Sequence, residues 1–376
     1  MNVSHKLLSG AVQTQRGFSL VEIMVALLIG LVLMGGMIQL LVGTKQTYRF
    51  HEALSRIQEN GRFAMEFLAQ DLRMTGFTGC PRTNPMANVL NTPADWWKNL
   101  GPGTVMGYDG NQVFPGRAVG AGVGDRINGT DAATFLGGSG GYFITASTAA
   151  VVGPPVVPST FTLNQLNKPN GGTLSTGDIV ILCDAVNTSL FQITNVAAGP
   201  PPVISHAVAG NPGNSTAFLF PPLGTLDAYV PNRTTVVDYT PSAYYVGVSN
   251  SGVARSLYRL QLQVTAAGVA SMVTQELVEG VENMQVFYGV DANNDGQVDP
   301  AYVDANAVAN WNNVLSVRVI LLLASPENTV NLDNQWVMFP PADTGNANTA
   351  GSGFTAGDRR LYQVFSTTVG LRNRLP

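Results

Sequence analysis

The chain has 376 residues, enough for one large domain or two smaller ones, and a formal net charge of −4 with only 12% charged residues. Its lysines and arginines form no cluster, which excludes direct binding to nucleic acid through the phosphates. The 41 glycines and 22 prolines, with many Asn, Ser and Thr residues, are typical of a secreted β-rich protein with long turns between short strands.

The first predicted element is an apolar segment that follows a short basic leader. From Phe18 to Gly43 the only charged side chain is Glu22, and these 26 residues exceed the length that a membrane-spanning helix needs. Lys6 and Arg16 precede the segment, which predicts a cytoplasmic N-terminus and an exported remainder. A cleaved secretory signal would have a shorter apolar region and a small-x-small cleavage site. A plain anchor would leave Glu22 unexplained, because an intramembrane carboxylate is costly.

The stretch "RGFSLVEIMVALLIGL" resembles the class III signal of type IV prepilins and of type II secretion pseudopilins. The resemblance implies that a prepilin peptidase cuts after Gly17, which removes residues 1–17 as a leader peptide, and that the new N-terminal residue, Phe18, is N-methylated. It also implies that Glu22 acts in filament assembly. In a bundle of such helices its carboxylate would pair with the α-amino group of a neighbouring subunit, and such a pair offsets much of the cost of burying either charge.

The transmembrane part, residues 18–43, is expected to continue as the amphipathic half of one long helix, residues 44–77. Apolar and small side chains recur there at steps of three or four residues, which predicts a stripe facing a core. The stripe consists of Leu54, Ile57, Gly61, Ala64, Leu68 and Leu72. Phe63 and Phe67 form a second apolar row beside it.

The remainder, residues 78–376, is expected to form a β-rich globular domain. Alternating or apolar runs around turn residues predict hairpins at 179–196 and 242–264, and residues 314–325 are apolar enough for a central strand with 361–371 as a neighbour. The predicted fold class is therefore α+β and pilin-like, with a long N-terminal helix packed on a large antiparallel β-sheet domain.

More of the chain carries a resemblance to one branch of minor pilins. The stretches "RFAMEFLAQDLRMTGFTGC", "ELVEGVENMQVFYGVDANNDGQVD", "WNNVLSVRVILLLAS" and "VFSTTVGLRNRLP" resemble the PilW family, whose relative in type II secretion is the GspJ-type pseudopilin. Residues 84–230 carry no such resemblance. The resemblance implies a minor pilin in the inner membrane, with a periplasmic C-terminal domain before assembly and a place in the cell-surface pilus afterwards.

The resemblance also implies partners and roles. The partners are prepilin peptidase, other minor pilins, the major pilin and a tip adhesin, and the roles are priming of pilus assembly and support of adhesion and twitching motility. A minor pseudopilin of type II secretion is the alternative within this family.

A periplasmic hydrolase anchored by its N-terminus is the second alternative. The stretch "GGSGG" at 137–141 fits G-x-S-x-G with Ser139 at its centre, but the hydrolase motif needs a strand before it and a helix after it, and a glycine-rich loop is expected here. His51 and His206 are the only histidines beyond the leader, and His51 falls within the predicted long helix. No catalytic residue and no required cofactor are therefore expected.

Cys80 and Cys183 are the only cysteines of the chain. Export would place them in an oxidising compartment, where disulfides form and persist. Two cysteines without clustered histidines make a poor zinc site. A disulfide between them is therefore expected.

The loop "DANNDGQVD" at 291–299 resembles a calcium loop of the EF-hand type. Such loops use oxygens at positions one, three, five, seven and nine, with glycine at six. The candidate calcium ligands are Asp291, Asn293, Asp295, Gln297 and Asp299. Tyr302 occupies the twelfth position, where a bidentate acid is expected, and a turn rich in Asx and Gly residues is the alternative.

Overall fold

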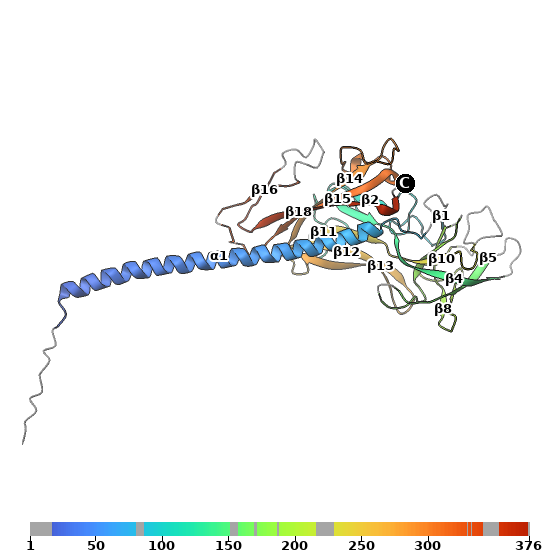
Figure 1. Ribbon diagram of the computed structural model, residues 1–376, viewed down its shortest axis with the longest axis horizontal. Coiled ribbons are helices and arrows are strands. Elements are labelled where there is room, and N and C mark those ends of the chain that lie inside the picture. The colour runs from blue at the N-terminus through green and yellow to red at the C-terminus, as the bar shows by residue number, and fades with distance from the viewer. Residues whose placement is uncertain are drawn as a thin grey trace, which may run out of the picture. The chain divides into compact units, whose positions relative to one another are not determined.

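The computed structural model confirms the α+β fold class, with one long N-terminal helix and mainly antiparallel β-sheets (Figure 1). It describes residues 17–79, 86–150, 157–168, 171–185, 188–215, 229–328, 330–331, 333–340 and 353–374. The chain divides into two compact units, Met1–Glu52 and Ala53–Pro376. Helix α1 (Leu20–Met74) contributes to both.

In the first unit, helix α1 is apolar around its whole circumference up to about Gly43. The side chains from Leu20 to Val42 are exposed, and this stretch is long and apolar enough to cross a membrane. A helix without a polar face has no preferred side to turn toward water. Lipid or other apolar helices are therefore the environments that suit it.

In the second unit, the rest of α1 buries one stripe of residues against the sheets. The buried residues are Ala53, Ile57, Gly61, Ala64, Leu68, Ala69 and Leu72. This confirms five of the six residues of the predicted stripe, whereas Leu54 is only half-buried. Phe63 and Phe67, the predicted second row, remain 43% and 37% exposed.

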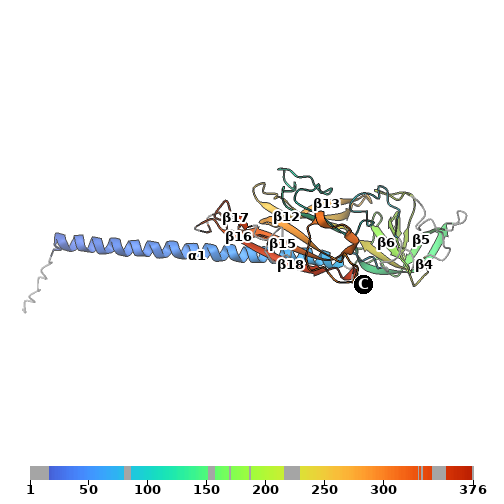
Figure 2. The same ribbon diagram turned by 90° about the horizontal axis from the view of Figure 1, so that it is seen from above.

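Two antiparallel sheets lie against this part of the helix. The five-stranded sheet has the order β13-β12-β11-β3-β2, and the three-stranded sheet has the order β14-β15-β18. Their strands are β2 (Val105–Tyr108), β3 (Ala132–Phe135), β11 (Ser242–Val248), β12 (Arg255–Val264), β13 (Ala270–Glu279), β14 (Val281–Val290), β15 (Val314–Ala324) and β18 (Tyr362–Gly370). Figure 2 shows β18 alongside α1. A Cβ built on Gly61 would overlap the ring of Phe365 from β18, so this ring lies directly over Gly61.

A third, eight-stranded sheet has the order β1-β7-β6-β10-β4-β5-β9-β8, and only its β1–β7 pair is parallel. Its strands are β1 (Met86–Asn88), β4 (Gly138–Ala150), β5 (Val157–Leu163), β6 (Ile179–Cys183), β7 (Thr188–Gln192), β8 (Asn195–Ala197), β9 (Val203–Ser205) and β10 (Thr235–Tyr239). It lies beyond the C-terminal end of α1 (Figure 1). The remaining elements are the pair β16 (Trp336–Met338) and β17 (Gly353–Thr355) and the 3-10 turns η1 (Ala305–Ala307), η2 (Trp311–Asn313) and η4 (Arg372–Arg374).

Both predicted hairpins are confirmed, as β6–β7 and β11–β12, and β15 is the central strand of its sheet with β18 as a neighbour. The prediction of a glycine-rich loop around residues 137–141 is wrong. Strand β4 begins at Gly138, and Ser139 pairs with Asp238 of β10. A chain so rich in glycine can still extend where neighbouring strands supply the hydrogen bonds.

Candidate assembly site

The N-terminus of α1 is closed by a reciprocal pair of hydrogen bonds between Ser19 and Glu22. The Ser19 N–H donates to Glu22 Oε2 at 2.9 Å, and the Glu22 N–H donates to Ser19 Oγ at 3.2 Å. This is a capping box, in which the first helical amides, which have no partner within the helix, are satisfied by side chains. The S-x-x-E spacing is visible in the sequence, but the role of Ser19 was not predicted.

The three N-terminal residues assigned to processing and assembly lie together at this helix start. Gly17, Phe18 and Glu22 are all exposed, and the Phe18 side chain is 83% exposed. A Cβ built on Gly17 would meet no atom within 4 Å. Residues 17–19 are thus exposed ahead of a capped helix, and cleavage after Gly17 and methylation of Phe18 stay predictions.

At its other end, α1 is joined to the five-stranded sheet by a half-buried ion pair that sequence reasoning missed. Asp71 accepts a hydrogen bond from the Tyr244 hydroxyl at 2.8 Å and lies 2.9 Å from Arg259 Nη2. Burial and the Asp71 carboxylate raise the pKa of Tyr244 well above its ordinary value, so the phenol remains a donor. Because these residues lie far apart in the sequence, no local signal indicates their contact.

A polar cleft of about 600 Å³ opens beside this ion pair. Lys168 also lines this cleft, and its Nζ lies 2.9 Å from Asp178 Oδ2 and 3.4 Å from Asp238 Oδ1. Burial raises the pKa of Asp238 to about 6, although Lys168 opposes that shift. The acids and bases of the cleft form ion pairs with one another, as in a structural charge network, although the buried Arg259 Nε has no hydrogen-bond partner among the described residues.

The candidate calcium loop is closed by its own backbone amides. Asp291 accepts the N–H of Asp295 at 3.0 Å through Oδ1 and the N–H of Gly296 at 2.9 Å through Oδ2, while Asp299 Oδ2 accepts the Ala292 N–H at 3.2 Å. Among the described residues, no three Asp, Glu, His or Cys side chains are grouped to hold a metal ion. The predicted ligand set also includes amide and carbonyl oxygens, and calcium binding stays a prediction.

Of the two cysteines, Cys183 is buried at the end of β6, and Cys80 lies outside the described residues. The preceding residue, Gly79, lies close to strand β10. A Cβ built on Gly79 would lie 2.7 Å from Val237 Cγ2 and 3.4 Å from Thr235 Oγ1. Thr235 is the partner of Cys183 in the β10–β6 ladder. The chain thus passes beside the strand next to Cys183 immediately before Cys80, and the disulfide stays a prediction.

The surroundings of Ser139 do not match the hydrolase motif. That motif places its serine on a sharp turn from a strand into a helix. Ser139 instead lies at the start of strand β4, which continues to Ala150. His206 is buried, and no described group bonds to its Nε2. Burial lowers its pKa to about 4.

Two family models match the chain. The first, described as type IV pilus-assembly protein W, matches residues 243–373, which run from β11 to η4. The second, a prokaryotic N-terminal methylation motif, matches residues 13–38, which include Gly17, Phe18 and Glu22. No curated protein and no solved structure shows significant similarity to the chain.

Proposed function

We propose that this chain, which belongs to the PilW family of type IV pilins, is a minor pilin that is processed at the inner membrane and built into a type IV pilus. The observation that carries the proposal is the methylation motif at residues 13–38, which spans the exposed apolar start of helix α1. A pilin needs both features, because the same helix first anchors the precursor and later packs among other subunits.

The exposed apolar surface of helix α1 supports both states of the chain, the membrane-anchored precursor and the assembled pilus subunit. In the first unit the apolar side chains from Leu20 to Val42 are exposed. A surface of this size is costly in water and marks a lipid or protein contact. Lipid covers it in the membrane-anchored precursor, and the helices of neighbouring subunits cover it in the pilus.

Priming of assembly is the role we assign within the pilus. With other minor pilins and the major pilin as partners, the chain would help to begin the filament and to support adhesion and twitching motility, with a tip adhesin as a further partner. The support is the match to a family described as acting in pilus assembly. A minor pseudopilin of type II secretion would share the N-terminal motif, so the C-terminal match favours the pilus.

Processing provides the direct test. Wild-type protein recovered from membranes should begin at N-methylated Phe18, as measured by intact mass and N-terminal sequencing, and it should be present in sheared pili. Gly17→Trp should leave the full precursor in the membrane, because a bulky side chain blocks the scissile position. Gly10→Trp places the same side chain elsewhere in the leader and should be processed normally.

Two outcomes would contradict the proposal. A mature N-terminus beyond Gly36 would show that an ordinary secretory signal had been cleaved. A correctly processed protein that never appears in sheared pili would show that the chain is not a pilus subunit.

A further inference from the structure

The sheets of the described structure end in edge strands, and most of these edges are short, charged or covered. Strands β1, β8, β16 and β17 have three residues each, and β2 has four. Strand β13 carries Glu276 and Glu279. The outer edge of β14 is covered where the Met284 carbonyl accepts the Asp131 N–H at 2.9 Å. Short length, charge and cover are the devices that stop an edge from pairing with another chain.

Strand β18 has none of these protections. It is nine residues long, contains no charged residue and no proline, and pairs with β15 alone among the described strands. In an antiparallel ladder, alternate residues direct both backbone groups toward the partner strand and the others direct them away. Leu371 donates to Leu315 at 2.8 Å, which fixes the alternation. The residues directed away from β15 are Tyr362, Val364, Ser366, Thr368 and Gly370.

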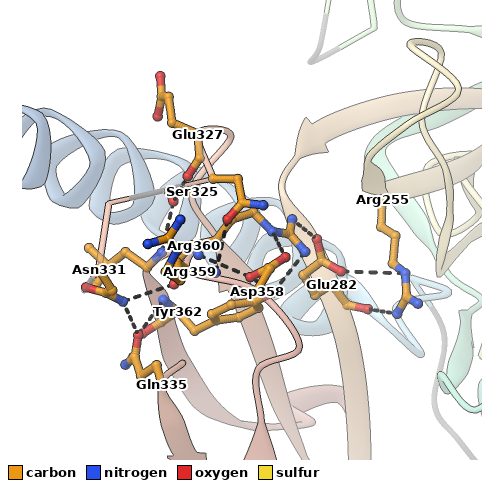
Figure 3. Close-up of polar contacts among 12 residues, drawn as sticks. Arg255, Glu282, Ser325, Glu327, Asn331, Gln335, Asp358, Arg359, Arg360 and Tyr362 are labelled. Atoms are coloured by element: carbon orange, nitrogen blue, oxygen red, sulfur yellow. Dashed lines mark hydrogen bonds and ion pairs between the residues drawn. The ribbon is translucent and has the colours of Figure 1, made fainter. Parts of the chain in front are cut away.

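The first of these residues, Tyr362, is bonded as though a further strand were present. Its N–H donates to Gln335 Oε1 at 2.9 Å, and its carbonyl accepts from Gln335 Nε2 at 2.9 Å (Figure 3). The primary amide of Gln335 therefore makes the two bonds that a neighbouring backbone would make. Arg360 holds the start of β18 in place through Glu282 at 2.6 Å and Asp358 at 2.7 Å.

The other four outward residues have no such partner in the described structure. No bond is made there by the backbone groups of Val364, Ser366, Thr368 or Gly370. Ser366, Thr368 and Gly370 are exposed, and a Cβ built on Gly370 would meet no atom within 4 Å. A row of N–H and C=O groups at the spacing of a sheet is thus open along most of β18.

We propose that β18 accepts an extended segment of a neighbouring pilus subunit as the fourth strand of its sheet. This rests on the proposed incorporation into a pilus. The occupant is an extended polypeptide because only a backbone offers donors and acceptors at the same repeat as the open edge. Ser366 offers a hydroxyl group, whereas the Thr368 hydroxyl accepts a hydrogen bond from Arg318 Nε at 3.2 Å. A strand with no basic side chain opposite Thr368 therefore suits this edge.

Hydrogen exchange compares the edge in two states of the full chain, purified in detergent and present in sheared pili. In the detergent-purified protein the amides of Val364, Ser366 and Thr368 should exchange rapidly. In the pilus they should exchange at least tenfold more slowly. The Tyr362 amide, already bonded to Gln335, should be protected in both states and serves as the internal control.

Variants of β18 test whether its open edge is needed for assembly into pili. Ser366→Pro removes an outward N–H without removing a bond within the chain, because proline is tolerated at such edge positions. Its content in sheared pili should fall at least fivefold, while Ser366→Thr, which keeps the N–H, should assemble like wild type. Thr368→Lys leaves the backbone unchanged, replaces the hydrogen bond from Arg318 Nε to Thr368 Oγ1 with a second positive charge on the edge, and should reduce assembly if Ser366→Pro proves to be unfolded.

The outcomes separate this inference from the proposed function. Wild-type protein in pili, with edge amides that exchange as fast as in detergent and with both edge variants at wild-type levels, would overturn strand addition and leave the pilin function intact. Absence of the wild-type protein from pili would instead contradict the function itself.

Discussion

At the scale of single residues, Asp131 is a buried acid whose pKa is raised far above its ordinary value. It is 5% exposed at the junction of β3 and β14, where its Oδ2 accepts the Val286 N–H at 2.8 Å. Desolvation by burial raises its pKa to about 8, and the nearby Asp109 adds to the shift, while the hydrogen bond and Arg126 oppose it. Burial thus favours the protonated form of this carboxyl in the folded chain.

This shift predicts a dependence of stability on pH. The unfolded chain ionises Asp131 near pH 3.8, whereas the folded chain retains the proton to about pH 8. Between these values the free energy of unfolding should fall as pH rises, by at most about 1.4 kcal/mol per pH unit from this group. The free energy of unfolding of Asp131→Asn, compared with that of wild type, should be higher at pH 8 than at pH 5. Urea unfolding of both proteins at both pH values measures this difference. An identical pH dependence in both proteins would show that Asp131 is ionised in the fold.

At the scale of elements, the contact between α1 and β18 depends on the missing side chain of Gly61. A Cβ at this position would overlap the ring of Phe365. Gly61→Leu should destabilise the second unit by about 1–3 kcal/mol through overpacking, and Phe365→Ala in the same chain should recover part of the loss. Gly43→Leu makes the same change where a Cβ meets nothing within 4 Å and should leave thermal melting unchanged. Additive effects of Gly61→Leu and Phe365→Ala would argue against this contact.

The 291–299 loop carries the calcium prediction. Asp291, Asp295 and Asp299 place three carboxylates within nine residues, and a cation would relieve their mutual repulsion. The full chain in detergent should melt higher in calcium than in chelator, by about 1.4 kcal/mol of stabilisation at ten times the dissociation constant. Asp295→Ala should abolish the difference, and Asp333→Ala, another exposed acid, should retain it. Equal melting with and without calcium would leave the loop as a turn.

The predicted disulfide between Cys80 and Cys183 would join the segment after α1 to the eight-stranded sheet. It would close a loop of about 100 residues, for which chain entropy allows on the order of 4–5 kcal/mol of stabilisation. Cys80→Ser and Cys183→Ser should each lower the melting temperature by the same amount, and the double variant should be no worse than either, because all three remove one bond. Titration of the denatured, unreduced wild type should find no thiol; two thiols per chain would refute the pairing.

Across the whole molecule, the features that the sequence predicted are those with local signals. The α1 stripe and the β6–β7 and β11–β12 hairpins follow from periodicity and turn residues within about 20 positions of one another. The order of the sheets, the Asp71–Arg259 ion pair and the open edge of β18 depend on pairings across long stretches of chain, which no local pattern encodes. The capping role of Ser19 is an exception among the features that were not predicted, because its S-x-x-E spacing with Glu22 is a local signal.

The capping box changes how the assembly role of Glu22 has to be tested. Glu22→Ala removes both the carboxylate and the cap, so its failure to assemble would not distinguish the two. Glu22→Gln keeps an oxygen that accepts the Ser19 N–H and removes only the charge, because glutamine also serves in a capping box. Ser19→Ala keeps the charge and removes the hydroxyl half of the cap.

If Glu22 pairs with the α-amino group of a neighbouring subunit, the charge rather than the cap decides assembly. Glu22→Gln should then be inserted and cleaved normally but fall at least fivefold in sheared pili, since the neutral amide leaves the neighbour's ammonium group buried without a counterion. Ser19→Ala should assemble close to wild type. The opposite ranking, with Glu22→Gln assembling normally and Ser19→Ala failing, would assign Glu22 to the start of helix α1 alone.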